Sequence, residues 1–160
     1  MREIKFRGRR LDNGKWVTGD LLHSKNGKVL INAGTKMFTT YAEVDPNTVG
    51  QFTGHRDKKG RDIYEGDILR REWCYRSDPE YDDRGEVTGY NYERTGHIIA
   101  PVAFAPCAGF HTKGGYSVMH NPGADEPSLL ACTINKLKAT KSVIIGNIYD
   151  HPELTKAPKQ

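Results

Sequence analysis

Turn-forming residues interrupt this sequence so often that long helices are excluded. The 160 residues include 17 Gly and 8 Pro, and the aliphatic and aromatic residues between them come in short runs. Gly and Pro are the residues that most often end regular structure. Asn-Gly occurs at positions 13–14 and 26–27, and this dipeptide accepts the positive φ angles of a tight β-hairpin turn. The sequence therefore predicts a mainly β protein with at most one or two short helices.

Strand-forming runs between these turns predict the individual strands. Residues 3–7 alternate polar and apolar side chains, as a half-buried strand does. Together with the turns at 12–15 and 24–28, they predict a β-meander over residues 3–32. Pro101 interrupts a later strand, which places it on a sheet edge or at a β-bulge. Further strands are expected at residues 51–54, 61–64, 68–75, 97–104, 116–119 and 142–149.

Three segments differ from this pattern. Residues 76–94 are acidic, rich in Tyr and poor in aliphatic residues, which indicates a long exposed hairpin tip or a mobile insertion. Residues 126–138 suit a short helix, with Ser128 as its N-terminal cap. Residues 155–160 form a polar tail.

The order of the strands predicts how the chain is divided. Short strands joined by Gly-containing turns favour a small barrel or a sandwich. A Gly-Asp step into a strand, followed by shorter strands and a terminal apolar strand, is typical of SH3-like barrels. We therefore expect a short-stranded β-meander lobe over residues 1–50 and an SH3-like small barrel over residues 51–154, with the acidic insertion at about 76–94. A chain of this length forms one domain or two small lobes that share a core.

The three cysteines are widely spaced and form no metal-binding pair. Cys74, Cys107 and Cys132 include no CxxC motif, so reduced thiols are expected. Cys107, His111 and His120 are metal-binding residue types, but three residues on a Gly-rich loop do not specify a site. We therefore expect no metal and no other cofactor.

The first residues and the hydropathy pattern bear on location. The N-terminal ten residues are charged and no apolar segment follows them, so no secretory signal is expected. No run approaches the ~20 apolar residues that cross a bilayer. The expected location is the cytoplasm, without a membrane partner.

One sequence motif occurs twice in the chain. FRGRRLDNGKWVTGDLL runs from Phe6 to Leu22, and FTGHRDKKGRDIYEGDIL runs from Phe52 to Leu69. In both copies a charged turn is followed by Gly-Asp and two aliphatic residues. Asp in such a position commonly accepts backbone N–H bonds. The residues that we interpret as structural turn residues are Gly19, Asp20, Gly66 and Asp67.

The alternative to a structural role for this repeated motif is a catalytic site. Asp20 and Asp67, with His23 and His55, are candidates for acid–base chemistry. Nothing in their spacing brings the two carboxylates to one substrate atom, as paired acid–base catalysis requires. The chain also lacks a P-loop, an HExxH motif and a nucleophile elbow. We therefore expect no catalytic residue.

Positive charge is concentrated in the first half of the chain. Residues 1–71 hold 15 Lys and Arg against nine Asp and Glu, whereas residues 72–94 hold three against seven. Basic surfaces bind nucleic acid through counterion release, although a solvated surface is the commoner reason for such charge. Strand alternation places Arg7 and Arg9 on one face. The candidate nucleic-acid contacts are Arg7, Arg9, Arg10, Arg56, Lys58, Lys59 and Arg61.

Three blocks of the sequence resemble a known family. In order, they are KFRGRRLDNGKWVTGDLL, VDPNTVGQFTGHRDKKGRDIYEGDIL and VIIGNIYDHPEL, and they cover most of residues 5–22, 44–69 and 143–154. In content and order they are similar to the YopX family of phage and prophage proteins. The resemblance implies a mostly β protein with a C-terminal SH3-type barrel, made by a phage or prophage in a bacterial cytoplasm. It implies no activity, cofactor or catalytic residue.

The sequence favours a binding module over an enzyme. The leading hypothesis is a non-enzymatic module that binds nucleic acid or a host protein, because a β pattern and a basic first half occur without a catalytic motif. A second hypothesis is a self-associating structural protein, in which edge strands pair between protomers. An enzyme of unknown type is the third, and it would depend on the histidines and Cys107.

Overall fold

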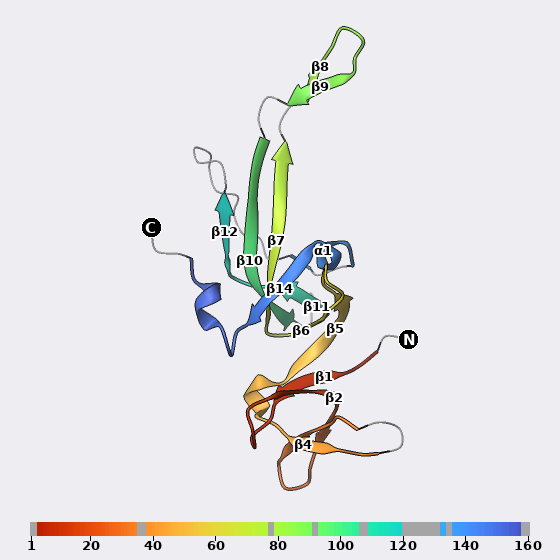
Figure 1. Ribbon diagram of the computed structural model, residues 1–160, viewed down its shortest axis with the longest axis vertical. Coiled ribbons are helices and arrows are strands. Elements are labelled where there is room, and N and C mark those ends of the chain that lie inside the picture. Colours follow the sequence, from red (N-terminus) through yellow and green to blue (C-terminus); the bar gives the residue numbers. More distant parts are fainter. Residues whose placement is uncertain are drawn as a thin grey trace.

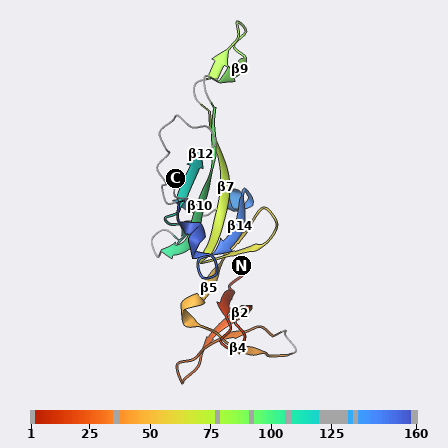
Figure 2. The ribbon, with the colours of Figure 1, turned by 60° about the vertical axis from the view of Figure 1, so that its left-hand side comes forward.

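The structure, a computed structural model, describes residues 3–34, 38–76, 79–90, 93–105, 109–119, 132–133 and 136–157. These residues form three antiparallel sheets (Figure 1), which confirms the mainly β prediction. The molecule is elongated, with the N-terminal strands at one end and a two-stranded ribbon at the other (Figure 2). No helix among the described residues is long and apolar enough to span a membrane.

The first sheet joins the predicted meander to two later strands. Its strands, in spatial order, are β4 (Tyr41–Glu43), β3 (Val29–Asn32), β2 (Trp16–His23), β1 (Phe6–Arg9), β5 (Gly50–Arg56) and β6 (Asp62–Tyr64). Both Asn-Gly turns are present, with Gly14 and Gly27 at φ angles of 68° and 81°, so the meander prediction is confirmed. Phe6 pairs with Gly19 of β2 and with Gln51 of β5. One sheet therefore continues across residue 50, and the division into two lobes there stays a prediction.

A small apolar core lies on one face of this sheet. Val29, Ile31 and Val44 are buried. Gly8 permits their close packing, because a Cβ atom there would lie 3.0 Å from Ile31 Cδ1 and 3.1 Å from Val44 Cβ. Between β4 and β5 the chain forms the 3-10 helix η1 (Pro46–Thr48). The side chains that pack against the buried three are Phe6, Val17, Leu21 and Val49.

The second sheet is open, which differs from the predicted SH3-like barrel. Its order is β13 (Cys132–Thr133), β11 (Gly109–Thr112), β10 (Glu93–Ala105), β7 (Asp67–Arg76) and β14 (Ser142–Asn147), and β12 (Tyr116–Met119) also pairs with β10. Among the described strands no pairing joins the β13 and β14 edges. A barrel requires staggered strands whose edges close on each other, whereas β7 and β10 continue side by side well beyond β14 (Figure 1).

Pro101 lies inside the sheet, so its predicted edge or bulge position is wrong. It pairs with Ile68 of β7 in an unbroken register. Its carbonyl accepts a hydrogen bond of 3.0 Å from the Lys113 N–H on the other side. The nitrogen and the oxygen of one strand residue face the same neighbour. The missing N–H of Pro101 therefore falls where β10 changes its partner from β12 to β11, at the end of the β11 pairing.

The acidic segment forms a hairpin, which was one of the two predicted alternatives. Strands β8 (Pro79–Tyr81) and β9 (Val87–Tyr90) pair in a two-stranded sheet of their own. This ribbon continues from the end of the β7–β10 ladder and projects from the rest of the molecule (Figures 1 and 2). Nearly all of its side chains are exposed.

The helices are short and only partly where the sequence predicted them. Helix α1 is Lys136–Thr140, and the 3-10 helix η2 is Pro152–Thr155. Within the predicted helix, residues 132–133 belong to strand β13, whereas Ser128 lies outside the described residues. Strand pairing of Cys132 with Thr112 replaces helix formation there. Through Ala139, α1 covers a buried cluster whose other members are Ile63, Leu69, Val102 and Phe110.

Candidate functional site

Arg7 connects the first sheet to the start of β7. Its Nη2 lies 2.7 Å from Asp67 Oδ1, and the Asp67 side chain is only 1% exposed. The guanidinium also lies over two aromatic rings, 4.7 Å from the Trp16 centroid and 4.9 Å from the Tyr64 centroid. With 15% of its side chain exposed, Arg7 is a structural cation. It is not available to a nucleic-acid phosphate.

Asp67 is held from a second direction, as a turn residue. Its other oxygen accepts the backbone N–H of Tyr64 at 2.8 Å, and Gly66 before it has a φ angle of 83°. Gly66 therefore lies in the turn, and Asp67, the first residue of β7, closes that turn through its side chain. Burial raises the pKa of the Asp67 carboxyl above its ordinary value, because Arg7 and the Tyr64 N–H only partly offset the loss of water.

The C-terminal block contacts the same place. Trp16 Nε1 donates to Asp150 Oδ2 at 2.8 Å, and the Trp16 ring lies 5.9 Å from that of Tyr149. Arg9 Nη1 is 3.6 Å from Asp150 Oδ1. We call this contact region the Arg7 junction, and its members are Arg7, Trp16, Tyr64, Asp67, Tyr149 and Asp150.

The first Gly-Asp pair behaves differently from the second, and its predicted turn is wrong. Gly19 and Asp20 lie inside the eight-residue strand β2, where Asp20 pairs with Asn32 of β3. A Cβ atom at Gly19 would lie 1.9 Å from the carbonyl oxygen of Asn32. Close approach between two strands, and not a turn, explains this glycine. Asp20 and Asp67 therefore stand in different sheets and share no site.

The first predicted basic cluster is occupied by carboxylates. Arg7 pairs with Asp67, Arg9 with Asp150, and Arg10 donates through Nε to Asp12 at 2.9 Å. Each cation of this cluster therefore faces a carboxylate of the same chain.

The second predicted cluster surrounds a buried carboxylate that sequence reasoning assigned only to a turn. Asp57 accepts the backbone N–H groups of Lys59 and Arg61 at 2.9 Å and that of Ile144 at 3.1 Å. Arg61 Nη2 is 2.7 Å from Asp57 Oδ2. Burial works against ionisation of Asp57, but these donors lower the pKa of the carboxyl below its ordinary value. Asp57 therefore fixes the β5–β6 turn against β14.

This arrangement presents five cations at one corner of the molecule. The Lys58 N–H donates to the Ser142 carbonyl at 2.8 Å, which brings Lys141 next to the turn. We call this surface the basic corner, and its members are Arg56, Lys58, Lys59, Arg61 and Lys141. All five are exposed.

The cations of the basic corner are not all paired. Arg56 pairs with Asp62 and Arg61 pairs with Asp57. Lys58, Lys59 and Lys141 have no carboxylate partner within the part of the chain that the structure describes. Three exposed ammonium groups are therefore free to bind an anion.

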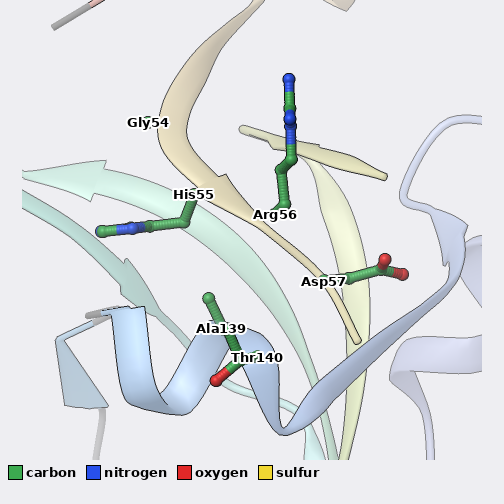
Figure 3. A pocket seen from close by; sticks show the side chains of 6 residues that line it. All are labelled: Gly54, His55, Arg56, Asp57, Ala139 and Thr140. Atoms are coloured by element: carbon green, nitrogen blue, oxygen red, sulfur yellow. The ribbon is translucent and has the colours of Figure 1, made fainter. Parts of the chain in front are cut away.

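An open groove borders the basic corner. It lies between β5 and α1, with a volume of about 440 Å³ (Figure 3), and its lining residues are Gly54, His55, Arg56, Asp57, Ala139 and Thr140. The His55 side chain extends above α1, while Arg56 points away from the helix (Figure 3).

Sequence reasoning missed two parts of this surface. Lys141 and the α1 side of the groove stand some eighty positions after the β5–β6 turn, and no local pattern connects the two segments. The signal that did exist was the charge run from Arg56 to Arg61.

The metal-binding residue types noted in the sequence are Cys107, His111 and His120. Among the described residues no three His, Cys, Asp or Glu side chains gather as metal ligands do. His111 Nδ1 lies 3.1 Å from the Gly109 carbonyl oxygen. Cys107 and His120 lie outside the described residues.

The fold, the Arg7 junction and the basic corner together define a class of protein. This is a mainly β protein with open antiparallel sheets, in which the contacts of the Arg7 junction join the N-terminal, central and C-terminal blocks. The sequence model of the YopX protein family matches residues 5–156, and the chain belongs to that family.

Solved structures and curated proteins give two further comparisons. The crystal structure of protein EF1440 from Enterococcus faecalis is similar over 98% of this chain and 100% of that chain, with 21% sequence identity and a TM-score of 0.44. A comparison with curated proteins finds no match.

The sequence blocks that carried the family resemblance meet at the Arg7 junction. Arg7 and Trp16 come from the first block, Tyr64 and Asp67 from the second, and Tyr149 from the third. The blocks are thus explained by the contacts that hold the fold together.

Proposed function

We propose that this YopX-family chain is a non-enzymatic binding module that holds nucleic acid at the basic corner. The observation that carries the proposal is the presence, beside an open groove, of three exposed lysines that have no carboxylate partner among the described residues. Following the family resemblance, the proposal places the protein among phage or prophage products that act in a bacterial cytoplasm.

The chemistry of the basic corner suits phosphates. Lysine ammonium groups neutralise backbone phosphates and release condensed counterions, which supplies most sequence-independent affinity for nucleic acid. The arginines are already bound by Asp57 and Asp62, so bidentate recognition of base edges is not part of the proposal. The expected binding is therefore independent of base sequence and sensitive to salt.

A pair of matched double variants tests this proposal. Lys58→Gln with Lys59→Gln removes two unpaired cations from the basic corner. The control, Lys15→Gln with Lys25→Gln, removes two exposed lysines from the hairpin turns of the first sheet. The two double variants therefore have the same net charge.

Anisotropy of a fluorescent oligonucleotide in low salt reports the binding. We expect the Lys58 and Lys59 variant to lose at least about tenfold in affinity, and the control variant to stay near the wild-type value. Equal losses in both variants, or no binding by the wild-type protein, would overturn the proposal.

Arg7, Arg9 and Arg10 are unsuitable positions for a binding test. Replacing Arg7, Arg9 and Arg10 together would remove the partner of buried Asp67, so lost binding would then reflect unfolding. The Lys58 and Lys59 positions avoid this problem because both side chains are exposed.

A further inference from the structure

The β8–β9 ribbon has one apolar face that is largely exposed, and its Tyr90 ring has the Arg76 guanidinium 5.2 Å from its centroid. Pro79 pairs with Tyr90, and Tyr81 pairs with Val87. Cross-strand partners lie on the same face of a ribbon, and so do residues two apart on one strand. Pro79 and Tyr81 are two apart and each has its own cross-strand partner, so the four residues share a face although the register shifts between Glu80 and Tyr81. Tyr81, Val87 and Tyr90 are 62%, 51% and 41% exposed.

Negative charge surrounds this apolar face. The ribbon and its turn carry four exposed carboxylates against one exposed arginine, Arg84. The carboxylates are Glu80, Asp82, Asp83 and Glu86. Asp82 orders the turn by accepting the N–H groups of Arg84 and Glu86, each at 2.9 Å. The ribbon is thus an ordered acidic element with aromatic residues at its centre.

A free-standing ribbon with an exposed apolar face is unfavourable in water. A lone two-stranded hairpin is only marginally stable in water, and this one projects from the end of the molecule (Figures 1 and 2). An exposed apolar face rimmed by charge indicates an interaction surface. Its negative charge selects a positively charged partner.

We infer that the β8–β9 ribbon docks onto the basic corner of a second copy of this chain. The basic corner has five exposed cations and the ribbon has four exposed carboxylates, so the two surfaces are complementary in charge. Tyr81 can stack on a lysine or arginine of the corner, because aromatic faces attract cations. Two ribbons would repel each other through their like charges.

The geometry requires the two surfaces to come from different copies. Ser142, beside the basic corner, pairs with Arg71 of β7, whereas the ribbon begins beyond Arg76. The β7–β10 ladder holds these points about 17 Å apart, at ~3.4 Å per strand residue. The contact therefore joins two copies. It closes as a two-fold dimer if the copies exchange ribbons, and it adds further copies if it repeats head to tail.

This inference rests on the basic corner of the proposed function. It adds that nucleic acid and a second copy of the chain compete for that corner. Nucleic acid and the ribbon of a second copy would use the same cations. Binding of an oligonucleotide is therefore expected to dissociate the self-associated protein. Conversely, oligonucleotide binding should weaken as protein concentration, and with it self-association, rises.

Sedimentation velocity of the full chain tests the inference without nucleic acid. In low salt we expect the mass to rise above 18.0 kDa as protein concentration is increased, and to return to that value in high salt. A wild-type protein that stays monomeric in low salt at every concentration would overturn the inference.

Two variants, each with one surface changed, make the test specific. The ribbon variant carries Glu80→Gln, Tyr81→Ser and Asp83→Asn, and the corner variant carries Lys58→Gln and Lys59→Gln. Each variant alone is expected to be monomeric.

An equal mixture of the two variants is expected to give a dimer of about twice 18.0 kDa that does not grow further, because one intact ribbon meets one intact corner. A mixture that stays monomeric, or a ribbon variant that associates like the wild-type protein, would contradict the inference.

The same proteins separate this inference from the proposed function. The ribbon variant keeps the basic corner, so it is expected to bind oligonucleotide at least as tightly as the wild-type protein. Binding of oligonucleotide by a wild-type protein that never self-associates would overturn only the docking of the ribbon. Self-association without oligonucleotide binding would overturn only the proposed function.

Discussion

At the scale of the residue, Arg7 and Arg9 show how surroundings set the role of a charge. The two arginines are two positions apart on β1, and both are adjacent to a carboxylate. Arg7 is 15% exposed and faces an Asp67 that is 1% exposed. Arg9 is 46% exposed and lies 3.6 Å from Asp150. Removing one member of a buried pair leaves a charge without compensation, whereas an exposed pair contributes little.

Arg7→Ala is therefore expected to lower the free energy of unfolding by about 3–5 kcal/mol. Arg9→Ala, as the matched control, is expected to change it by no more than about 1 kcal/mol. Urea unfolding at neutral pH measures both. Equal losses would show that the Arg7 junction does not hold the sheets together.

The loss in Arg7→Ala is also expected to depend on pH. The pKa of the Asp67 carboxyl is already raised by burial, and without Arg7 it rises further. A carboxyl with a raised folded-state pKa binds its proton more tightly when folded, so stability increases as pH falls through that pKa. The stability gap between Arg7→Ala and the wild-type protein should therefore narrow between pH 7 and the ordinary carboxyl value of 3.8. Urea unfolding across this range checks it, and a gap that widens would contradict it.

Asp57 is predicted to have the opposite pH dependence. Its pKa is lowered in the folded protein, so its contribution is present above the unfolded value of 3.8 and is lost as pH falls through the folded-state pKa. Asp57→Asn is expected to cost about 2 kcal/mol at neutral pH, because bonds to a charged acceptor are lost. The cost should shrink in acid.

Thermal unfolding from pH 7 to pH 3 measures this cost. Asp83→Asn, at an exposed position of the ribbon turn, serves as the control and should have no effect. A cost for Asp57→Asn that is constant over the whole range would contradict the assignment.

Two glycines test the contact between the second and third blocks. Gly66 and Gly60 both have positive φ angles, 83° and 78°. A Cβ atom at Gly66 would lie 3.0 Å from Tyr149 Cε2, but one at Gly60 meets nothing within 4 Å. Gly60→Ala should cost about 1–2 kcal/mol from backbone strain alone, and Gly66→Ala should cost clearly more. Equal costs in chemical unfolding would show that Tyr149 yields freely.

At the scale of the element, local chemistry decided what the sequence could predict. The Asn-Gly turns at Gly14 and Gly27 were predicted correctly, although only the glycines have positive φ angles, so these turns are not of type I′. Gly19 and Gly66 stand in the same Gly-Asp dipeptide, yet one lies in a strand and one in a turn. Their difference comes from Asn32 and Tyr149, which are distant in sequence.

The remaining errors have the same origin. Barrel closure, the interior position of Pro101 and strand β13 all depend on pairing between distant segments. A short apolar run does not specify its partner, and so the sheet pairings could not be derived from one sequence.

The ribbon is expected to be dispensable for folding. Arg76 and Glu93 are cross-strand partners at the end of the β7–β10 ladder, so Asn-Gly in place of residues 77–92 would close a tight hairpin. The shortened protein should keep its Tm within about 4 °C, which corresponds to about 1 kcal/mol for a chain of this size. A larger loss would show that the ribbon contributes to the stability of the sheet.

At the scale of the whole molecule, the candidate site was only half predictable. Arg56, Lys58, Lys59 and Arg61 were predicted from one charge run, and the structure places them on one corner. Arg7, Arg9 and Arg10 were predicted with equal weight, but tertiary contacts give each a carboxylate partner. Sequence shows where charges are, whereas only the fold shows which of them are already neutralised.

The salt dependence of oligonucleotide binding tests the central claim most directly. The slope of log K against log salt is about −0.9 per neutralised phosphate, so three unpaired lysines predict about −3 for the wild-type protein. The Lys58→Gln and Lys59→Gln variant should give a slope of about −1. A wild-type slope near zero, or a slope that the two substitutions leave unchanged, would contradict nucleic-acid binding at the basic corner.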